Sequence, residues 1–368
     1  MDICFLEPFF SGSHETWLTQ LAEHSAHNIT ILSQRGRFWK WRMYGSALTL
    51  TEAFSRLDKV PDLIVASDML DLSSFLALNR RTIPAHVPVG IYFHENQVAY
   101  PWQSESEDVQ KGRDIHYAFI NYASALAADF LFFNSLWNRD SFFFGMEELL
   151  RKMPDDRHRG TVDLLKGKSH IMPIGMDLKS LDRDEPRDAA PEPLIIWNHR
   201  LEHDKNPLEL LEVLLELASQ EVPFHLALLT EITPLTEPRV MELIGELKER
   251  VTITGMISRA EYASWLHRGQ ILPVTSRHDF FGISIMEAVY CGCYPLLPRR
   301  LTYPALYEQE KHPEIFYDSR AALKSKLKQL LESPPPPGQY SHLAAPYDWS
   351  SLARKCDALL SAMAVQKA

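Results

Sequence analysis

The chain is poor in cysteine and has no long apolar run. Its 368 residues include only four cysteines, Cys4, Cys291, Cys293 and Cys356, too few to suggest a disulfide framework. No apolar run reaches the roughly 18–20 residues that a membrane-spanning helix requires. The first residues, MDICFLEPFF, lack the cationic region of a signal peptide. We therefore expect buried structural thiols and a cytoplasmic protein.

Several enzyme motifs are also missing. There is no Walker loop and no Ser-His-Asp arrangement at recognisable spacing, and HENQV (94–98) lacks the second histidine of a His-Glu-x-x-His zinc site. The only Asp-x-Asp, Asp182-Arg-Asp184, follows no predicted strand, and Cys291-Gly-Cys293 has no second Cys/His pair. We expect no metal site and no cofactor.

Basic residues are outnumbered by acidic ones. The chain has 38 Lys and Arg against 48 Asp and Glu, which gives a formal net charge of −10. This balance argues against a non-specific nucleic-acid binder, because such binding rests on neutralising phosphates. The negative net charge does not exclude a local basic patch. The length predicts two domains, at about 100–200 residues per domain.

Short apolar runs alternate with amphipathic stretches, which is typical of βαβ units and a parallel sheet. Strands are predicted at 3–7, 29–32, 63–66, 89–93, 130–133 and 170–174, and then at 194–197, 225–229, 251–254, 271–275, 294–297 and 314–317. The sequence therefore predicts an α/β fold with two tandem Rossmann-like, doubly wound domains and a C-terminal helix.

The segment boundaries follow from composition. We predict a first domain at 1–180, a charged, Pro- and Ala-rich linker at 181–193, a second domain at 194–338 and a C-terminal crossover helix within 339–368. The run SPPPPG before this last segment breaks regular structure. Asp348 and Ser350 are suitable N-caps for the final helix.

Two acids and a glycine follow the strand predicted at 271–275. In the stretch HDFFGISIMEA, Gly282 lies where a helix begins, and Asp279 and Glu287 are eight residues apart. Backbone N–H groups at a helix N-terminus suit an anionic oxygen, and carboxylates accept hydrogen bonds from polyol hydroxyls. The alternative is an N-capping Asp and a surface Glu on an ordinary helix.

Two cations follow the strand predicted at 194–197. Arg200 and Lys205 lie in the loop before a helix that begins at Pro207. The arginine fork and the lysine point charge together suit a diphosphate. The alternative is a pair of solvated cations.

The segment RGRFWKWR (35–42) combines cations and aromatic rings after the strand at 29–32. Its cations are Arg35, Arg37, Lys40 and Arg42, and its tryptophans are Trp39 and Trp41. No acid stands between Glu23 and Glu52. Cations can meet phosphates, and indole rings can stack on unstacked bases. The alternative is a packing corner, with the tryptophans filling the gap against a helix at 43–54.

These motifs together resemble known glycosyltransferases. NHRLEHDKNP is similar to the Arg-x4-Lys element, and HDFFGISIMEA to the Glu-x7-Glu element, of retaining glycosyltransferases with the GT-B architecture. IMPIGMD (171–177) resembles the end of their first domain, and YDWSSLARK (347–355) their final helix, which crosses back to that domain. FLEPFFSGSHETW, YFHENQVAYP and FFNSLWNRDSF resemble the tRNA-queuosine α-mannosyltransferase subfamily.

The closer resemblance implies a reaction and its site residues. Mannose would pass from GDP-mannose, without a metal ion, to the cyclopentene diol of queuosine in the tRNA anticodon loop. The implied catalytic residues are His94, Arg200, Lys205, Asp279 and Glu287. The implied donor contacts are Gly12, Gly255, Met256, Phe281 and Gly282, and the implied RNA contacts are Arg35, Arg37, Trp39, Lys40, Trp41 and Arg42. Arg200 and Lys205 would bind the diphosphate, Glu287 the ribose and Asp279 the sugar, with His94 on the acceptor side.

Asp279 and Ile174 depart from the family pattern. Asp279 stands where the group has Glu, so its contact with the sugar must shift by one methylene, and Ile174 stands where the broader group has Asn. Two other functions stay open: a GT-B enzyme acting on a glycan or lipid, and a non-catalytic RNA-binding protein on a transferase scaffold. We expect a nucleotide sugar and queuosine-containing tRNA as partners, and no stable membrane association.

Overall fold

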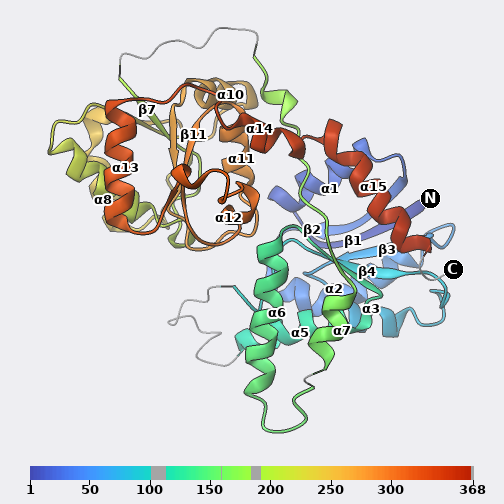
Figure 1. The fold of residues 1–368 in the computed structure, drawn as a ribbon. Coiled ribbons are helices and arrows are strands. Elements are labelled where there is room, and N and C mark those ends of the chain that lie inside the picture. The colour runs from blue at the N-terminus through green and yellow to red at the C-terminus, as the bar shows by residue number, and fades with distance from the viewer. Residues whose placement is uncertain (101–112, 159, 184–191, 366–368) are drawn as a thin grey trace. The chain divides into compact units, whose positions relative to one another are not determined.

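The computed structural model describes residues 1–100, 113–158, 160–183 and 192–365, and the chain forms two compact units (Figure 1). Unit 1 is Met1–Met176 with Trp349–Ala368, and unit 2 is Asp177–Asp348.

Unit 1 is built on a parallel six-stranded sheet with the order β2-β1-β3-β4-β5-β6. Its strands are β1 (Asp2–Phe10), β2 (Asn28–Arg35), β3 (Leu63–Ser67), β4 (Val89–Phe93), β5 (Phe130–Phe133) and β6 (Ser169–Ile171). One face carries α2 (Trp39–Phe54), α3 (Leu72–Leu78), α5 (Arg113–Ala127), α6 (Leu136–Arg151) and α7 (Thr161–Gly167); the other carries α1 (Gly12–His24) and α15 (Trp349–Val365) (Figure 1). Strands β3, β4 and β5 are buried along their whole length, as expected for a parallel sheet covered on both faces.

The C-terminal helix α15 completes the face that α1 covers. Trp349 Nε1 donates to Gln20 Oε1 at 2.8 Å, and Ser25 Oγ donates to Asp357 Oδ1 at 2.5 Å. A Cβ at Gly175 would lie 2.5 Å from the ring of Trp349, so only glycine fits there. The predicted crossover of the last helix to the first domain is confirmed.

Unit 2 has a second parallel sheet of six strands, in the order β12-β11-β10-β7-β8-β9. Its strands are β7 (Leu194–Trp197), β8 (His225–Leu228), β9 (Val251–Ile253), β10 (Ile271–Pro273), β11 (Tyr294–Pro298) and β12 (Phe316–Tyr317). Its helices are η1 (Lys179–Leu181), η2 (His203–Lys205), α8 (Pro207–Ala218), α9 (Pro238–Glu246), η3 (Lys248–Arg250), α10 (Arg259–Arg268), α11 (Ile283–Tyr290), α12 (Tyr303–Leu306), η4 (Pro313–Ile315), α13 (Arg320–Glu332), α14 (Ser341–Ala344) and η5 (Ala345–Tyr347).

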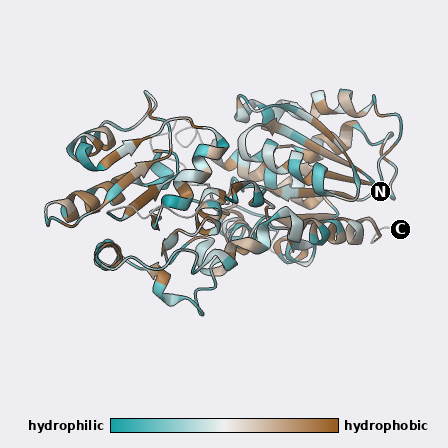
Figure 2. Ribbon diagram, turned by 90° about the horizontal axis from the view of Figure 1, so that it is seen from above, coloured by the Kyte–Doolittle hydropathy of each residue, from teal (hydrophilic) through white to brown (hydrophobic). Residues whose placement is uncertain are grey.

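Each sheet has its own apolar core. In unit 2, α8, α9 and α13 share a core with one face of the sheet, and α10, α11 and α14 pack together on the other face (Figure 1). The apolar residues concentrate on the strands and on the helix faces that meet them (Figure 2). The predicted α/β fold with two doubly wound domains is confirmed.

The unit boundary falls at Asp177, before the predicted linker. Leu178 and Leu181 are buried in unit 2, and Asp348 Oδ2 accepts hydrogen bonds from the backbone N–H groups of Leu178 and Lys179, both at 3.1 Å. Residues 339–348 therefore belong to unit 2, and only α15 crosses back. Most of the linker predicted at 181–193, including Asp184, lies outside the described residues.

The four cysteines are buried and none of them forms a disulfide, as the sequence predicts. Burial raises the pKa of Cys4 and of Cys356 to about 12. Cys293 Sγ donates to the carbonyl oxygens of Leu266 and Gly269, so this thiol is held by the backbone.

Candidate active site

The predicted donor-binding residues of unit 2 gather at the carboxyl edge of its sheet. Neighbouring strands β10, β7, β8 and β9 end side by side there. A cavity of about 960 Å³ opens at this edge, and its lining includes Arg200, Gly255, Met256, Arg259 and Tyr262. Ligands of doubly wound folds bind outside the carboxyl ends of the strands.

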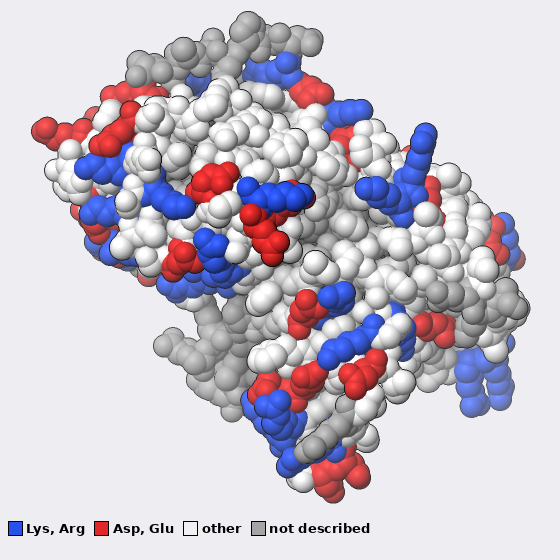
Figure 3. All heavy atoms as spheres, viewed as in Figure 1, with Lys and Arg blue, Asp and Glu red and all other residues white. Residues whose placement is uncertain are grey.

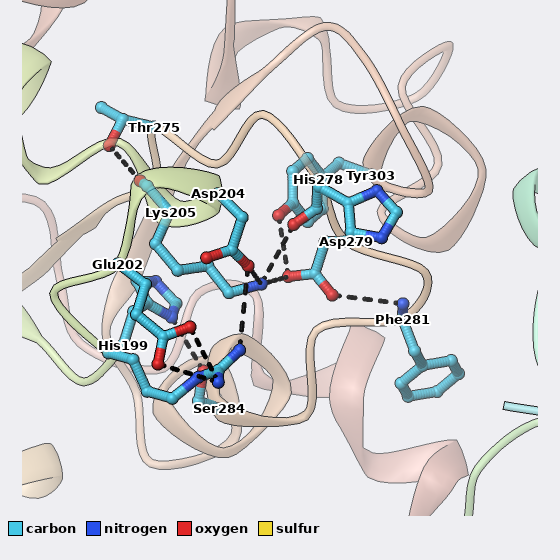
Figure 4. Close-up of polar contacts among 11 residues, drawn as sticks. His199, Glu202, Asp204, Lys205, Thr275, His278, Asp279, Phe281, Ser284 and Tyr303 are labelled. Atoms are coloured by element: carbon cyan, nitrogen blue, oxygen red, sulfur yellow. Dashed lines mark hydrogen bonds and ion pairs between the residues drawn. The ribbon is translucent and has the colours of Figure 1, made fainter. Parts of the chain in front are cut away.

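Lys205 and Asp279 form an ion pair in this edge (Figure 4). Lys205 Nζ lies 3.4 Å from Asp279 Oδ2 and 3.4 Å from Asp204 Oδ2, and it donates to the carbonyl oxygen of His278 at 3.0 Å. The Tyr303 hydroxyl donates to Asp279 Oδ2 at 3.1 Å. Burial disfavours both charges, but the partner charges outweigh it, so the pKa of Lys205 is raised and that of Asp279 is lowered. Both side chains are charged at neutral pH.

Arg200 is more exposed to solvent than Lys205. Its side chain is 65% exposed, and its guanidinium pairs with Glu202 at 2.9 Å and lies 3.8 Å from Asp204 Oδ2. An exposed guanidinium and a largely buried ammonium, both within 4 Å of Asp204 Oδ2, can together meet an anionic ligand.

Glu287 is held on α11 by two side chains of α10. Arg259 Nη1 donates to Glu287 Oε1 at 2.7 Å, and the Tyr262 hydroxyl donates to Glu287 Oε2 at 2.8 Å. The sequence reasoning missed Arg259 and Tyr262. The available signal is the capping box of Ser258 and Glu261, which starts α10 directly after Met256 and so places this helix beside the cavity.

His199 is a second residue that the sequence reasoning missed. It is buried after β7, its Nδ1 lies 2.9 Å from Ser284 Oγ, and its Nε2 has no hydrogen-bond partner among the described residues. Burial, aided by the charge of Lys205, lowers the pKa of His199 to about 4, so the ring is neutral. Its position directly before Arg200 is the signal that could have pointed to it.

The predicted glycines adopt conformations that favour glycine. Gly282 is the N-cap of α11 with φ +89°, Gly255 has φ +63° after β9, and Gly12 has φ +54° at the start of α1. The backbone N–H of Phe281 donates to Asp279 Oδ1 at 3.4 Å, so the loop before α11 is fixed by the acid that it carries.

His94 follows β4 in unit 1 and is buried. Its backbone N–H donates to Asp68 Oδ1 at 2.9 Å, and its carbonyl oxygen accepts from Asn134 Nδ2 at 2.7 Å. Its ring lies beside Glu7 and His14, two further residues that the sequence reasoning missed. Gly12 opens the helix that carries His14.

The segment 35–42 is not the loop that the sequence predicts. Arg35 is the last residue of β2, and α2 begins at Trp39, four residues before the predicted 43. Phe38 makes the turn between them with φ +53° and is 78% exposed. The two tryptophans differ in exposure. Trp39 is half-buried with its ring 5.2 Å from that of Tyr117, whereas Trp41 is 62% exposed.

The cations of this segment differ in their contacts. Arg35, Arg37 and Arg42 form no ion pair with any residue in the described part of the chain, and Lys40 lies over the ring of Trp39 at 5.6 Å. On the face drawn in Figure 3, basic and acidic side chains are interspersed.

The predicted residues are thus divided between the units. Arg200, Lys205, Gly255, Met256, Asp279, Phe281, Gly282 and Glu287 belong to unit 2; Gly12, Arg35, Arg37, Trp39, Lys40, Trp41, Arg42 and His94 belong to unit 1. No described helix has the length and apolarity needed to cross a membrane.

Several solved structures share this fold. Sucrose-phosphate synthase from Thermosynechococcus elongatus is 16% identical, with 99% of each chain covered and a TM-score of 0.72. The catalytic domain of starch synthase IV from Arabidopsis thaliana is 10% identical, with 100% of each chain covered and a TM-score of 0.68. The family model "Glycosyl transferases group 1" matches residues 179–345. The chain is a glycosyltransferase with the GT-B architecture.

Two closer similarities identify the family. A family model described as "tRNA-queuosine alpha-mannosyltransferase N-terminal" matches residues 2–176. The tRNA-queuosine alpha-mannosyltransferase of Drosophila melanogaster is 31% identical over 341 residues, which cover 90% of this chain and 87% of that protein. The chain belongs to the tRNA-queuosine α-mannosyltransferase family, and the resemblance read from its motifs is confirmed.

Proposed function

We propose that the protein transfers mannose from GDP-mannose, with retention of configuration, to the cyclopentene diol of queuosine in a tRNA anticodon loop. One observation carries the donor half of this proposal. Arg200 lines the cavity at the carboxyl edge of the unit 2 sheet, and Lys205 lies near it, since both cations are within 4 Å of Asp204 Oδ2. Glu287 is held at this edge by Arg259 and Tyr262, which also line the cavity. Two cations and a carboxylate suit a diphosphate and a ribose.

On the donor side, each charged residue has a distinct role. Arg200 and Lys205 bind the diphosphate and neutralise the charge that develops as the sugar leaves. Glu287 accepts hydrogen bonds from the ribose hydroxyls, and Asp279 contacts the sugar. Because two cationic side chains stand at the diphosphate, we expect no metal requirement.

The transfer needs no protein nucleophile. The bond between the sugar and the diphosphate breaks as the acceptor hydroxyl bonds to the same carbon on the same face. The proton of that hydroxyl passes to the departing phosphate oxygen. The oxocarbenium-like transition state and the phosphate are stabilised electrostatically, and His94 gives polar assistance from the acceptor side.

On the acceptor side, the turn 35–38 and the first turn of α2 hold the RNA. Arg35, Arg37, Lys40 and Arg42 meet phosphates, and the exposed ring of Trp41 stacks on an unpaired base. Trp39 supports this surface from below by its contact with Tyr117. A tRNA substrate places the enzyme in the cytoplasm.

The test is incubation of the enzyme with GDP-mannose and queuosine-containing tRNA, followed by nucleoside mass spectrometry. The expected product is queuosine with one added hexose, and tRNA that carries guanosine at that position is the negative control. Absence of product with every nucleotide sugar in a panel would contradict the proposal. Donor turnover stimulated by lipid vesicles instead of tRNA would point to a lipid acceptor.

A further inference from the structure

Three buried side chains from three elements of unit 1 meet at one oxygen. Glu7 on β1 directs Oε2 to His14 Nδ1 of α1 at 3.3 Å and to His94 Nε2, after β4, at 3.7 Å. The side chains of Glu7, His14 and His94 are 1%, 12% and 7% exposed. Neither Glu7 nor His14 has a role in the proposed transfer.

The Glu7 carboxylate is fixed by its other oxygen. Oε1 accepts hydrogen bonds from Ser67 Oγ at 3.0 Å and from the backbone N–H of Phe9 at 2.9 Å. Oε2 is therefore left to the two histidines. Burying a carboxylate without hydrogen-bond partners costs free energy, and these two hydrogen bonds offset that cost for Glu7.

Two histidines and a carboxylate this close could also be metal ligands. The ring planes argue against that reading. The imidazoles of His14 and His94 stack with centroids 3.9 Å apart and planes only 24° apart. A metal ion lies in the plane of each imidazole that binds it, at about 2.0–2.1 Å, and two nearly parallel, stacked planes do not converge at that distance. The geometry suits hydrogen bonding and charge pairing.

The pKa values of the two histidines shift in opposite directions. Burial opposes charge on His14, but Glu7 outweighs it through its charge and hydrogen bond, and Asp68 and Glu95 add to this, so the pKa of His14 is raised to about 9. Burial and the neighbouring charge of His14 both lower the pKa of His94. Burial and Glu95 raise the pKa of Asp68, which faces His94 from the end of β3. At neutral pH, His14 is therefore a cation and His94 is neutral.

We propose that Glu7 and His14 are positioning residues, which hold the His94 ring ready to accept a hydrogen bond from the acceptor diol. This inference rests on the proposed function, in which His94 stands on the acceptor side. A vicinal diol has two hydroxyls. One attacks the sugar and passes its proton to the departing phosphate, while the other donates to His94 and so orients the pair. Only a neutral imidazole can accept that hydrogen bond.

The test is the pH dependence of kcat/KM for queuosine-containing tRNA, measured from pH 6 to pH 8 for wild type, His14→Gln and Glu15→Gln. Glu15 is the exposed neighbour of His14 on α1 and serves as the control. Wild type and the control should change by less than about twofold over this range. His14→Gln removes the cation that opposes protonation of His94 and leaves the Glu7 carboxylate to His94 alone, so the pKa of His94 should rise and kcat/KM should fall at least about threefold from pH 8 to pH 6.

The outcomes separate a positioning role from a structural one. A His14→Gln profile that is uniformly lower but parallel to wild type would overturn the inference. If His14→Gln does not fold, His14→Asn serves instead, since it also removes the cation beside His94 while keeping Glu7, and it should also make the profile acid-sensitive. Activity that is lost with a chelator and restored by zinc would overturn the inference in favour of a metal site. Wild type without any product on this tRNA would contradict the proposed function itself.

Discussion

Lys205 and Asp279 are bound to each other across the loops that follow β7 and β10, with Lys205 Nζ 3.4 Å from Asp279 Oδ2. The lysine is only 15% exposed, so its charge is less screened than that of a surface cation. The ion pair fixes a positive charge near Arg200 at the carboxyl edge of the unit 2 sheet before any donor binds. Such preorganised charge is the usual source of electrostatic rate enhancement.

Lys205→Ala should lower kcat by about 100- to 1000-fold, the loss typical of removing one preorganised charge that stabilises the transition state. The measurement is the initial rate of mannose transfer at saturating donor and tRNA. Lys248→Ala, at a lysine that is 75% exposed, is the matched control and should behave as wild type. A loss of less than about threefold for Lys205→Ala would show that this lysine does not meet the diphosphate.

Tyr303→Phe should raise the KM for the donor about two- to tenfold and leave kcat nearly unchanged. The substitution removes the hydrogen bond from the Tyr303 hydroxyl to Asp279 Oδ2, and one such bond contributes about 0.5–1.5 kcal/mol. Asp279 then keeps Lys205 as its cation but loses part of its fixed orientation. Steady-state kinetics in GDP-mannose test this, and an unchanged KM would count against a sugar contact by Asp279.

Trp41→Ala should raise the KM for tRNA about five- to a hundredfold, because stacking on one base is worth about 1–3 kcal/mol. Its melting temperature should stay close to that of wild type, since the ring is 62% exposed. Trp39→Ala should instead lower the melting temperature, because that ring packs on Tyr117. Equal destabilisation by both substitutions would assign the whole segment a packing role.

Arg37→Ala combined with Lys40→Ala should raise the KM for tRNA and flatten its dependence on salt, because fewer phosphates are neutralised. Donor affinity, measured by calorimetry with GDP-mannose, should be nearly unchanged. A parallel loss of donor affinity would show that the segment supports the fold and does not bind RNA.

Stability should decrease as the pH rises from about 7 to about 9.5. The pKa of His14 is raised from 6.5 to about 9 in the folded protein. Its contribution is therefore fully present below pH 6.5 and is lost as the pH passes through about 9. At 1.36 kcal/mol per pKa unit, this contribution is about 3 kcal/mol. Denaturant unfolding of His14→Gln across this range should show a shallower decline than wild type; an equal slope would contradict the shift.

Gly175→Ala should destabilise unit 1 by about 1–3 kcal/mol, because the new Cβ would overlap the ring of Trp349. Gly245→Ala is the control, since nothing lies within 4 Å of a Cβ built there in α9. That control should be stabilising by about 0.5–1 kcal/mol, the helix preference of alanine over glycine. Thermal unfolding of both variants decides the comparison.

The central strands are the part of the fold that sequence predicts best. β4, β5 and β7 occupy the residues predicted for them, 89–93, 130–133 and 194–197, because their apolar runs are continuous and end at polar residues. The edge strand β12 is shorter than its predicted 314–317. An edge strand pairs on one side only, so its ends depend on tertiary contacts that a local pattern does not contain.

In the site, too, residues that belong to a local pattern were predicted, and residues whose role depends on a distant contact were missed. Arg200, Lys205, Asp279 and Glu287 were predicted because each follows a predicted strand at an informative spacing. Arg259 and Tyr262 were missed because their function depends on meeting Glu287, 28 and 25 residues further along the chain. The helical start of α2 was missed for a related reason: Phe38 turns the chain by a left-handed conformation that its residue type does not favour.

The two chain crossings, at Met176–Asp177 and Asp348–Trp349, also bear on how the protein is made. On the ribosome, the first 176 residues emerge long before α15, whose Trp349, Leu352, Cys356 and Leu360 are all buried in the finished unit. Until then the α1 face of the first sheet lacks its cover. Unit 1 therefore reaches its native packing last, after unit 2 has been fully synthesised.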